Sequence, residues 1–86
     1  MALFLIHAPH TAEDCAKVVK LTLAVGYLTH FHWGCKVGEH CAWAMIEAEN
    51  EKEALLSVPT LIRDKSRAIK IVQFDPNDVE QWDETK

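Results

Sequence analysis

Long hydrophobic runs and basic clusters are both missing from this chain of 86 residues. No apolar run approaches the roughly 20 residues that a membrane-spanning helix needs, so we expect no membrane span. Lysine and arginine together number nine and form no cluster, and the formal net charge is −4 with neutral histidines. Because electrostatic binding of nucleic acid requires a basic patch, nucleic acid is not an expected partner.

Glycine is scarce, and the spacing of the glycines and cysteines excludes several kinds of site. The three glycines are scattered, so the sequence holds no glycine-rich phosphate loop. The three cysteines include no Cys-x-x-Cys pair, which argues against a zinc knuckle and a thioredoxin-type redox site. The apolar start of the chain, Ala2 to Ala8, lacks the basic segment and the cleavage site of a signal peptide. We therefore expect a cytoplasmic protein with reduced thiols.

The composition is that of a folded globular domain. Hydrophobic residues make up 49% of the chain and charged residues 26%, which argues against disorder. A chain this short holds one core, so we expect one domain over residues 1–76, followed by a short turn and polar tail over residues 77–86. The unusual feature is a set of five histidines and three cysteines, all within the first 41 residues.

The first half of the chain predicts a strand and then a helix. The apolar run Leu3 to Ala8 reads as a buried strand. Thr11 is a good helix N-cap, because its hydroxyl can accept the amide of Asp14. A helix then runs from Cys15 to Val25, and Gly26 supplies a stop.

The middle of the chain predicts a β-hairpin. Residues 28–36 read as a strand whose alternation puts Thr29, Phe31, Trp33 and Cys35 on one face. Val37 and Gly38 form a plausible two-residue loop, and His40 to Ala48 is the partner strand. This register places His32 opposite Trp43. One face of the hairpin is core-like, and the other is mixed, with His30, His32, Cys41, Trp43, Met45 and Glu47.

The second half of the chain predicts a helix, a connector and a last strand. Asn50 caps a helix that ends before Pro59, because proline cannot continue the hydrogen bonding. Pro59 to Ser66 reads as a connector and Arg67 to Phe74 as a strand. We expect Asn77 to Trp82 to form one helical turn that docks Trp82 on the body.

The predicted order is βαββαβ, which defines an α+β, ferredoxin-like fold with an antiparallel four-stranded sheet and two helices on one face. The other face would expose Trp43 and Met45, an apolar patch larger than monomers usually carry. We therefore expect two sheets to pair in a homodimer that forms a dimeric α/β barrel.

A set of segments in this order resembles a known group of proteins. The segments are His30-Phe-His32, the hairpin after it, Cys41-Ala-Trp-Ala-Met-Ile-Glu47-Ala48, and Glu51-Lys-Glu-Ala-Leu55. They resemble small bacterial and archaeal ferredoxin-like proteins, most of unknown function, of which one branch is described as nickel-binding. The resemblance implies the fold, a dimer and a divalent metal, with His32 and Glu47 as the positions carried over.

The spacing of two histidines supports the same chemistry. His30 and His32 lie two apart on the predicted strand, so their imidazoles share a face at a spacing that suits two ligands of one metal ion. Cys41 and Glu47 on the partner strand and His7 on the first strand are further candidate ligands. The expected metal is nickel or zinc.

Two other interpretations stay open. The protein is an enzyme of isomerase or oxygenase type if His30 and His32 work in an apolar pocket lined by Trp43 and Met45, which would hold a small ligand. Alternatively, it is a non-catalytic interaction or ligand-sensing module, because His-x-His pairs often occur without metal. The remaining candidates are assigned to structural positions: Cys15 to the helix core, and His10, Cys35 and His40 to loop or hairpin-tip positions.

Overall fold

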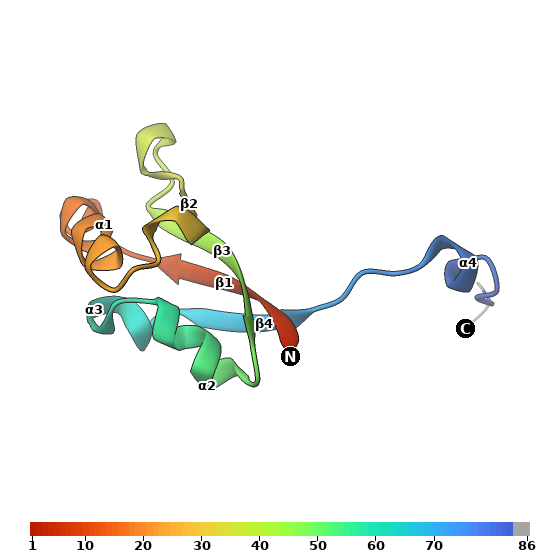
Figure 1. The fold of residues 1–86 in the computed structure, drawn as a ribbon. Coiled ribbons are helices and arrows are strands. Elements are labelled where there is room, and N and C mark those ends of the chain that lie inside the picture. Colours follow the sequence, from red (N-terminus) through yellow and green to blue (C-terminus); the bar gives the residue numbers. More distant parts are fainter. Residues whose placement is uncertain (84–86) are drawn as a thin grey trace.

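The computed structural model describes residues 1–83 and shows an α+β fold around one open antiparallel sheet of four strands. The strand order is β2-β3-β1-β4, so β1 and β3 form the centre. The helices α1, α2 and α3 lie beside the sheet, and α4 lies apart from it (Figure 1). The strands are β1 (Ala2–Pro9), β2 (Phe31–Trp33), β3 (Cys41–Ala48) and β4 (Arg67–Ile71). The helices are α1 (Cys15–Ala24), α2 (Glu51–Ala54), α3 (Thr60–Arg63) and α4 (Pro76–Val79), and the 3-10 turns are η1 (Leu28–His30), η2 (Cys35–Val37) and η3 (Leu55–Ser57).

The central strands bury one face and leave the other uncovered. In β1, Phe4 and Ile6 are buried, whereas the alternating residues Leu3 and Leu5 are only half-buried. Residues of the buried face and of α1, α2 and α3 form one hydrophobic core. This confirms the prediction that the helices cover one face of the sheet. We call the other side the open face. The pairing places on it His32, Leu3, Leu5, His7, Trp43, Met45, Glu47, Arg67, Ile69 and Ile71. The structure describes one chain, so the dimeric barrel stays a prediction.

Both predicted capping hydrogen bonds form, but only one of them caps a helix. The Thr11 hydroxyl accepts the Asp14 amide at 3.2 Å, as predicted, yet this bond closes a turn before α1, whose N-cap is Asp14 rather than Thr11. The Asn50 side chain accepts the amide of Glu53 at 2.8 Å at the start of α2. Such caps satisfy amides that have no partner inside the helix. The predicted connector after Pro59 is different, because it contains the short helix α3.

The hairpin keeps the predicted register but is much shorter than predicted. His32 pairs with Trp43, as expected. However, β2 has only three residues, and His30 lies in η1 rather than on the strand. The predicted two-residue loop at Val37 and Gly38 is wrong, because η2 and the residues around it form a longer connection to β3.

Two glycines make that longer connection possible. Gly34 accepts the Glu39 amide at 2.9 Å, and a Cβ on Gly34 would lie 2.5 Å from the Glu39 carbonyl oxygen. Gly38 ends η2 with a φ of 89°, in the left-handed region that favours glycine. The loop between β2 and β3 therefore depends on glycine at both positions.

The last strand ends early, and the chain after it leaves the body. β4 stops at Ile71 instead of Phe74, and residues 72–83, which we call the C-terminal arm, are all exposed. The arm extends away from the sheet and carries α4 (Figure 1). The predicted docking of Trp82 on the body is wrong, because Trp82 is 55% exposed and contacts the ring of Phe74 instead. The division of the chain at residue 76 stays a prediction, and residues 84–86 of the predicted tail lie outside the described residues.

Candidate metal centre

Two histidines and two cysteines meet at one end of the sheet. His10, Cys15, Cys35 and His40 each offer one ligand atom, and these four atoms lie within 4.8 Å of one another. All four side chains are half-buried. We call this set the His/Cys cluster.

The pairing of the central strands brings the two histidines together. Pro9 pairs with Cys41 at the end of the β1–β3 ladder, so His10 and His40 are the next residues outward on the two strands. The His10 amide donates to the His40 carbonyl at 3.0 Å, which extends the ladder by one step. The two imidazole rings lie edge to face with their centres 6.3 Å apart.

The two cysteines come from the segments that leave and enter this end of the sheet. Cys15 is the first residue of α1 and follows the turn that Thr11 caps. Cys35 is the first residue of η2, directly after Gly34. Each cysteine is therefore held next to the histidines by a short, hydrogen-bonded connection. The assignment of Cys15 to the helix core is corrected: it lies at the helix start and faces the cluster.

The cluster contains polar atoms that lack protein partners. Cys35 Sγ and His10 Nε2 share a hydrogen bond of 3.0 Å. The Nδ1 atoms of His10 and His40 are buried and have no hydrogen-bond partner among residues 1–83. Buried polar atoms are nearly always paired, so two unpaired ring nitrogens in one cluster point to a ligand.

Burial also affects the protonation of Cys35. It raises the pKa of Cys35 from 9.0 to about 11, and the neighbouring thiol of Cys15 adds to the rise. At neutral pH, Cys35 is therefore a neutral thiol in the metal-free protein. None of the three cysteines forms a disulfide. The cluster thus offers two thiols and two imidazoles, a donor set typical of transition-metal sites.

The residues predicted as metal ligands lie elsewhere, and the structure does not bring them together as one group. His7, His32 and Glu47 are on the open face. His30 contacts Tyr27 from η1, and Cys41 is buried with its Sγ near the carbonyl oxygen of Ala42 at 3.7 Å. Among residues 1–83, no group of three or more metal-ligating side chains includes any of these five. Metal binding by them stays a prediction.

The structure does form a hollow on the open face from other predicted residues. It has a volume of about 290 Å³ and is open to solvent on one side. Its lining residues are Leu5, His30, His32, Trp43, Ala44 and Met45, and we call it the open-face hollow. Both predicted ligand-lining residues, Trp43 and Met45, are therefore next to the histidine pair. The hollow contains both histidines of the enzyme interpretation, and that interpretation stays a prediction.

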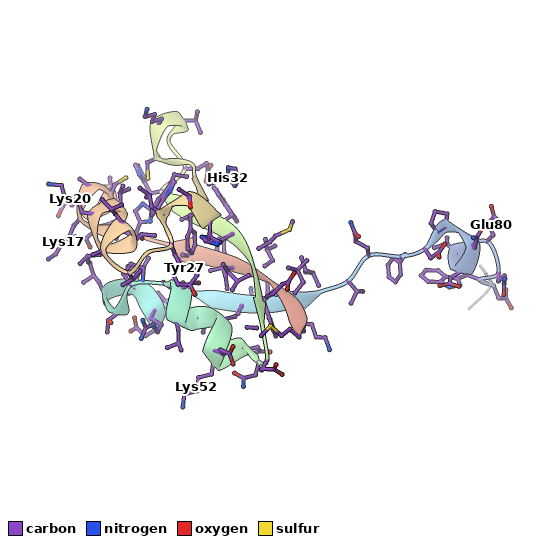
Figure 2. All side chains as sticks on the ribbon, viewed as in Figure 1. Lys17, Lys20, Tyr27, His32, Lys52 and Glu80 are labelled. Carbon is purple, nitrogen blue, oxygen red and sulfur yellow. The ribbon has the colours of Figure 1, made fainter. Side chains whose placement is uncertain are left out.

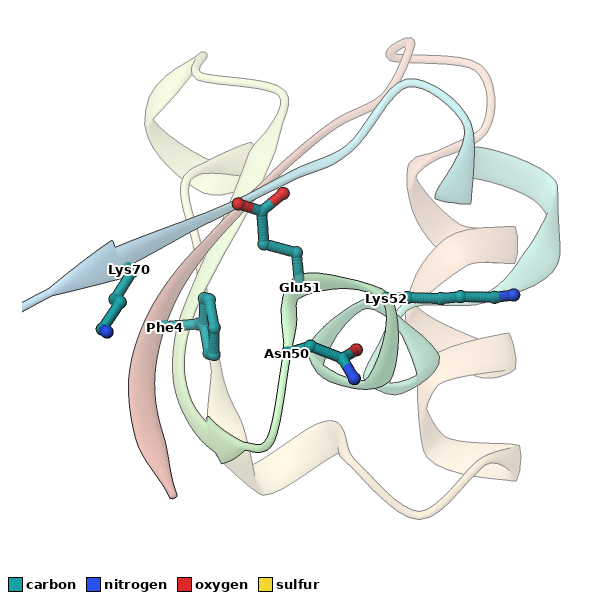
Figure 3. A pocket seen from close by; sticks show the side chains of 5 residues that line it. All are labelled: Phe4, Asn50, Glu51, Lys52 and Lys70. Carbon is teal, nitrogen blue, oxygen red and sulfur yellow. The ribbon is translucent and has the colours of Figure 1, made fainter.

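A second hollow, of about 520 Å³, lies at the start of α2. Figure 3 shows its lining residues Phe4, Asn50, Glu51, Lys52 and Lys70. The side chains of Lys52 and Lys70 point in different directions, so they do not converge on one anion (Figure 3). This hollow shares no residue with the His/Cys cluster and has no comparable chemistry.

A spacing in the sequence could have indicated the His/Cys cluster. His10 and Cys15 are separated by four residues, and so are Cys35 and His40, in the reverse order. A search for Cys-x-x-Cys pairs misses this mirrored pattern, because each pair here combines one histidine with one cysteine.

Fold and cluster together define a small α+β protein with a candidate His₂Cys₂ metal centre. No family model matches the chain, and no match was found among curated proteins or solved structures. Within residues 1–83, no helix is both long and apolar enough to span a membrane.

Proposed function

We propose that this protein binds a divalent transition metal ion through His10, Cys15, Cys35 and His40, and that the preferred metal is zinc. The observation that carries the proposal is the convergence of these four donor atoms within 4.8 Å. The unpaired Nδ1 atoms of both histidines give it independent support. Nickel remains the alternative metal, as the sequence resemblance implies.

The donor set favours zinc. Zinc holds sulfur at about 2.3 Å and imidazole nitrogen at about 2.0 to 2.1 Å in a tetrahedron, which separates the ligand atoms by about 3.3 to 3.8 Å. The observed limit of 4.8 Å is about 1 Å wider, so small side-chain rotations bring the donors into range. Two sulfur and two nitrogen ligands in a tetrahedron are typical of zinc, whereas nickel often adopts square-planar geometry.

Four protein ligands would give the ion a structural role. A catalytic zinc ion keeps one coordination position open for water or substrate, and a complete tetrahedron of protein ligands leaves none. A bound ion would join the ends of β1 and β3 to the starts of α1 and η2. The ion would thus connect residues 10–15 with residues 35–40, which are 20 positions further along the chain, and would stabilise the fold at the end of the sheet.

Metal analysis of the untagged, full-length protein tests the proposal. After loading with zinc and removal of excess metal, we expect close to one zinc ion per chain by elemental analysis. Cys35→Ser and His40→Ala should each remove most of it. The matched controls Cys41→Ala and His32→Ala change the same residue types outside the cluster and should keep it.

Each other outcome is informative. If His32→Ala lost zinc and His40→Ala kept it, the metal would be bound by the residues predicted from the sequence and not by the His/Cys cluster. Less than about a tenth of an ion per chain, with zinc or nickel, would overturn metal binding altogether. Circular dichroism of each variant shows whether it has folded, and competition between zinc and nickel identifies the preferred metal.

A further inference from the structure

The C-terminal arm exposes an unusual amount of apolar surface. Every residue from 72 to 83 is exposed, and the arm holds Val72, Phe74, Val79 and Trp82, which are between 41% and 68% exposed. The rings of Phe74 and Trp82 contact each other with centres 4.9 Å apart. A short segment that exposes two paired aromatic rings to water is typical of a surface that binds a partner.

The open face of the sheet is a second apolar surface that nothing in the described chain covers. Met45 is 62% exposed and Ile69 is 37% exposed. The open-face hollow lies on it, with Trp43 as its aromatic wall. One chain thus has an apolar arm and an apolar face, and the arm does not contribute to covering the face, because all of its residues remain exposed.

The arm is acidic, whereas the open face carries no net charge. Residues 72–86 contain five of the 13 acidic residues and one of the nine basic residues, so they carry a net charge of −4 and residues 1–71 carry none. Figure 2 shows Glu80 at the far end of the arm, and the labelled lysines on the helices of the body. The open face presents one basic residue, Arg67, and one carboxylate, Glu47, among mostly apolar side chains. The face therefore does not repel the acidic arm, and its apolar side chains can pack against the apolar residues of the arm.

An exchange of arms would bury two surfaces of each chain at once. Stable protein interfaces bury about 800 Å² on each partner. Both the open face and the 12 exposed residues of the arm would count toward this area.

We propose that two copies of this chain exchange their arms, so that the arm of each copy packs on the open face of the other. An aromatic side chain of the arm, Trp82 or Phe74, fills the open-face hollow of the second copy. The exchange is reciprocal, as a twofold interface requires, and it covers both apolar surfaces of both chains. The arm points away from its own sheet, which places it to reach a second copy (Figure 1).

The experiment compares full-length variants by light scattering and by dilution. We expect the wild type to have twice the chain mass of 9.8 kDa at micromolar concentration. The double variant Phe74→Ser, Trp82→Ser should raise the dimer Kd at least about tenfold, because buried aromatic anchors carry most of the binding in such interfaces. Met45→Glu should have a similar effect, because it places a negative charge where the acidic arm packs.

A matched control and a cross-linking step separate the alternatives. The double variant Leu23→Ser, Leu56→Ser changes apolar residues that are exposed on the body to a similar extent, and it should leave the dimer Kd within about threefold. A photoreactive phenylalanine at position 74, in a mixture of isotope-labelled and unlabelled chains, should yield cross-links between the two kinds of chain on β3.

Three results would overturn the proposal. One is a monomeric wild type at all concentrations. Another is a dimer whose Kd the arm variant leaves unchanged, which would mean that the sheets pair without the arms. The third is cross-linking only within a chain, which would mean that the arm folds back on its own sheet. Metal content should be the same in all of these variants, because none of them changes the His/Cys cluster.

Discussion

At the scale of single residues, Cys35 links the structure of the His/Cys cluster to its protonation. Burial comes first among the causes that raise its pKa to about 11, and the thiol of Cys15 comes next. A metal ion binds the thiolate, so binding must displace the Cys35 proton. The neutral thiol, by contrast, suits the metal-free protein, because an unpaired buried charge would be costly.

We expect the metal-free protein to lose stability as the pH rises from about 9 toward 11. The unfolded chain ionises Cys35 near its ordinary pKa of 9.0, whereas the folded chain ionises it at about 11. Between these values the unfolded state has lost the proton and the folded state keeps it, so alkali favours unfolding. This contribution is complete below pH 9 and disappears as the pH rises through 11.

Urea unfolding at several alkaline pH values, with a reductant and a chelator present, measures this dependence. Cys35→Ser removes the titrating group and should show a smaller decrease in the free energy of unfolding with pH. Burial also raises the pKa of Cys41, which is present in both proteins and therefore cancels in the comparison. Equal slopes for the two proteins would contradict the prediction.

At the scale of elements, the loop between β2 and β3 positions half of the candidate metal centre. It holds Cys35 and His40, and it closes through the hydrogen bond from the Glu39 amide to the Gly34 carbonyl. The close approach at Gly34 is between backbone atoms, so a side chain there cannot be accommodated by a rotamer change. The loop must move as a whole if Gly34 is replaced.

Gly34→Ala should therefore destabilise the protein more than Gly38→Ala does. The added Cβ would lie 2.5 Å from the Glu39 carbonyl oxygen, whereas at Gly38 there is open space and only the left-handed backbone is unfavourable. We expect about 1 to 3 kcal/mol for Gly34→Ala and about 1 kcal/mol for Gly38→Ala. Chemical denaturation measures both. The prediction fails if the two variants are equally stable.

At the scale of the whole molecule, the chain is small, and two parts of its body are not fully packed inside the core. Only one face of the sheet is covered by helices, and one end of the sheet holds four half-buried metal-ligating side chains. Domains of this size bury a smaller fraction of their surface than larger domains do, and they are marginally stable. A metal ion at the end of the sheet and a second chain on its open face would each add stability that the core cannot supply.

Zinc should therefore raise the melting temperature of the whole protein. A ligand at 100 times its Kd adds about 2.7 kcal/mol to the stability of the folded state. In a domain of this size that corresponds to a rise of about 10 to 20 °C. The double variant Cys15→Ser, Cys35→Ser should show no such rise in calorimetry with and without zinc. A wild type that melts at the same temperature in both conditions would contradict the prediction.

Local sequence patterns predicted the fold well wherever the physics is local. The side chains of Thr11 and Asn50 accept amides three residues further along, as predicted, because a sequence displays that distance directly. Asn50 thereby caps α2, whereas Thr11 closes the turn before α1. The register that places His32 opposite Trp43 follows from alternation along two strands close in sequence. Strand lengths were predicted less well. His30 lies in a 3-10 turn, where its amide donates to the Tyr27 carbonyl. Phe74 lies in the arm, because β4 pairs with β1 and that strand begins only at Ala2.

The patterns of helix capping and strand alternation did not predict the candidate metal centre. The sequence determined the fold class, the caps, the hairpin register and an excess of histidine and cysteine in its first half, because each depends on neighbouring residues or on composition. Only the tertiary structure decided which of these side chains meet. His10 reaches His40 through the pairing of β1 with β3, and the starts of α1 and η2 add the two thiols. Those contacts join residues up to 30 positions apart, where packing of the whole chain, rather than local spacing, sets the distances.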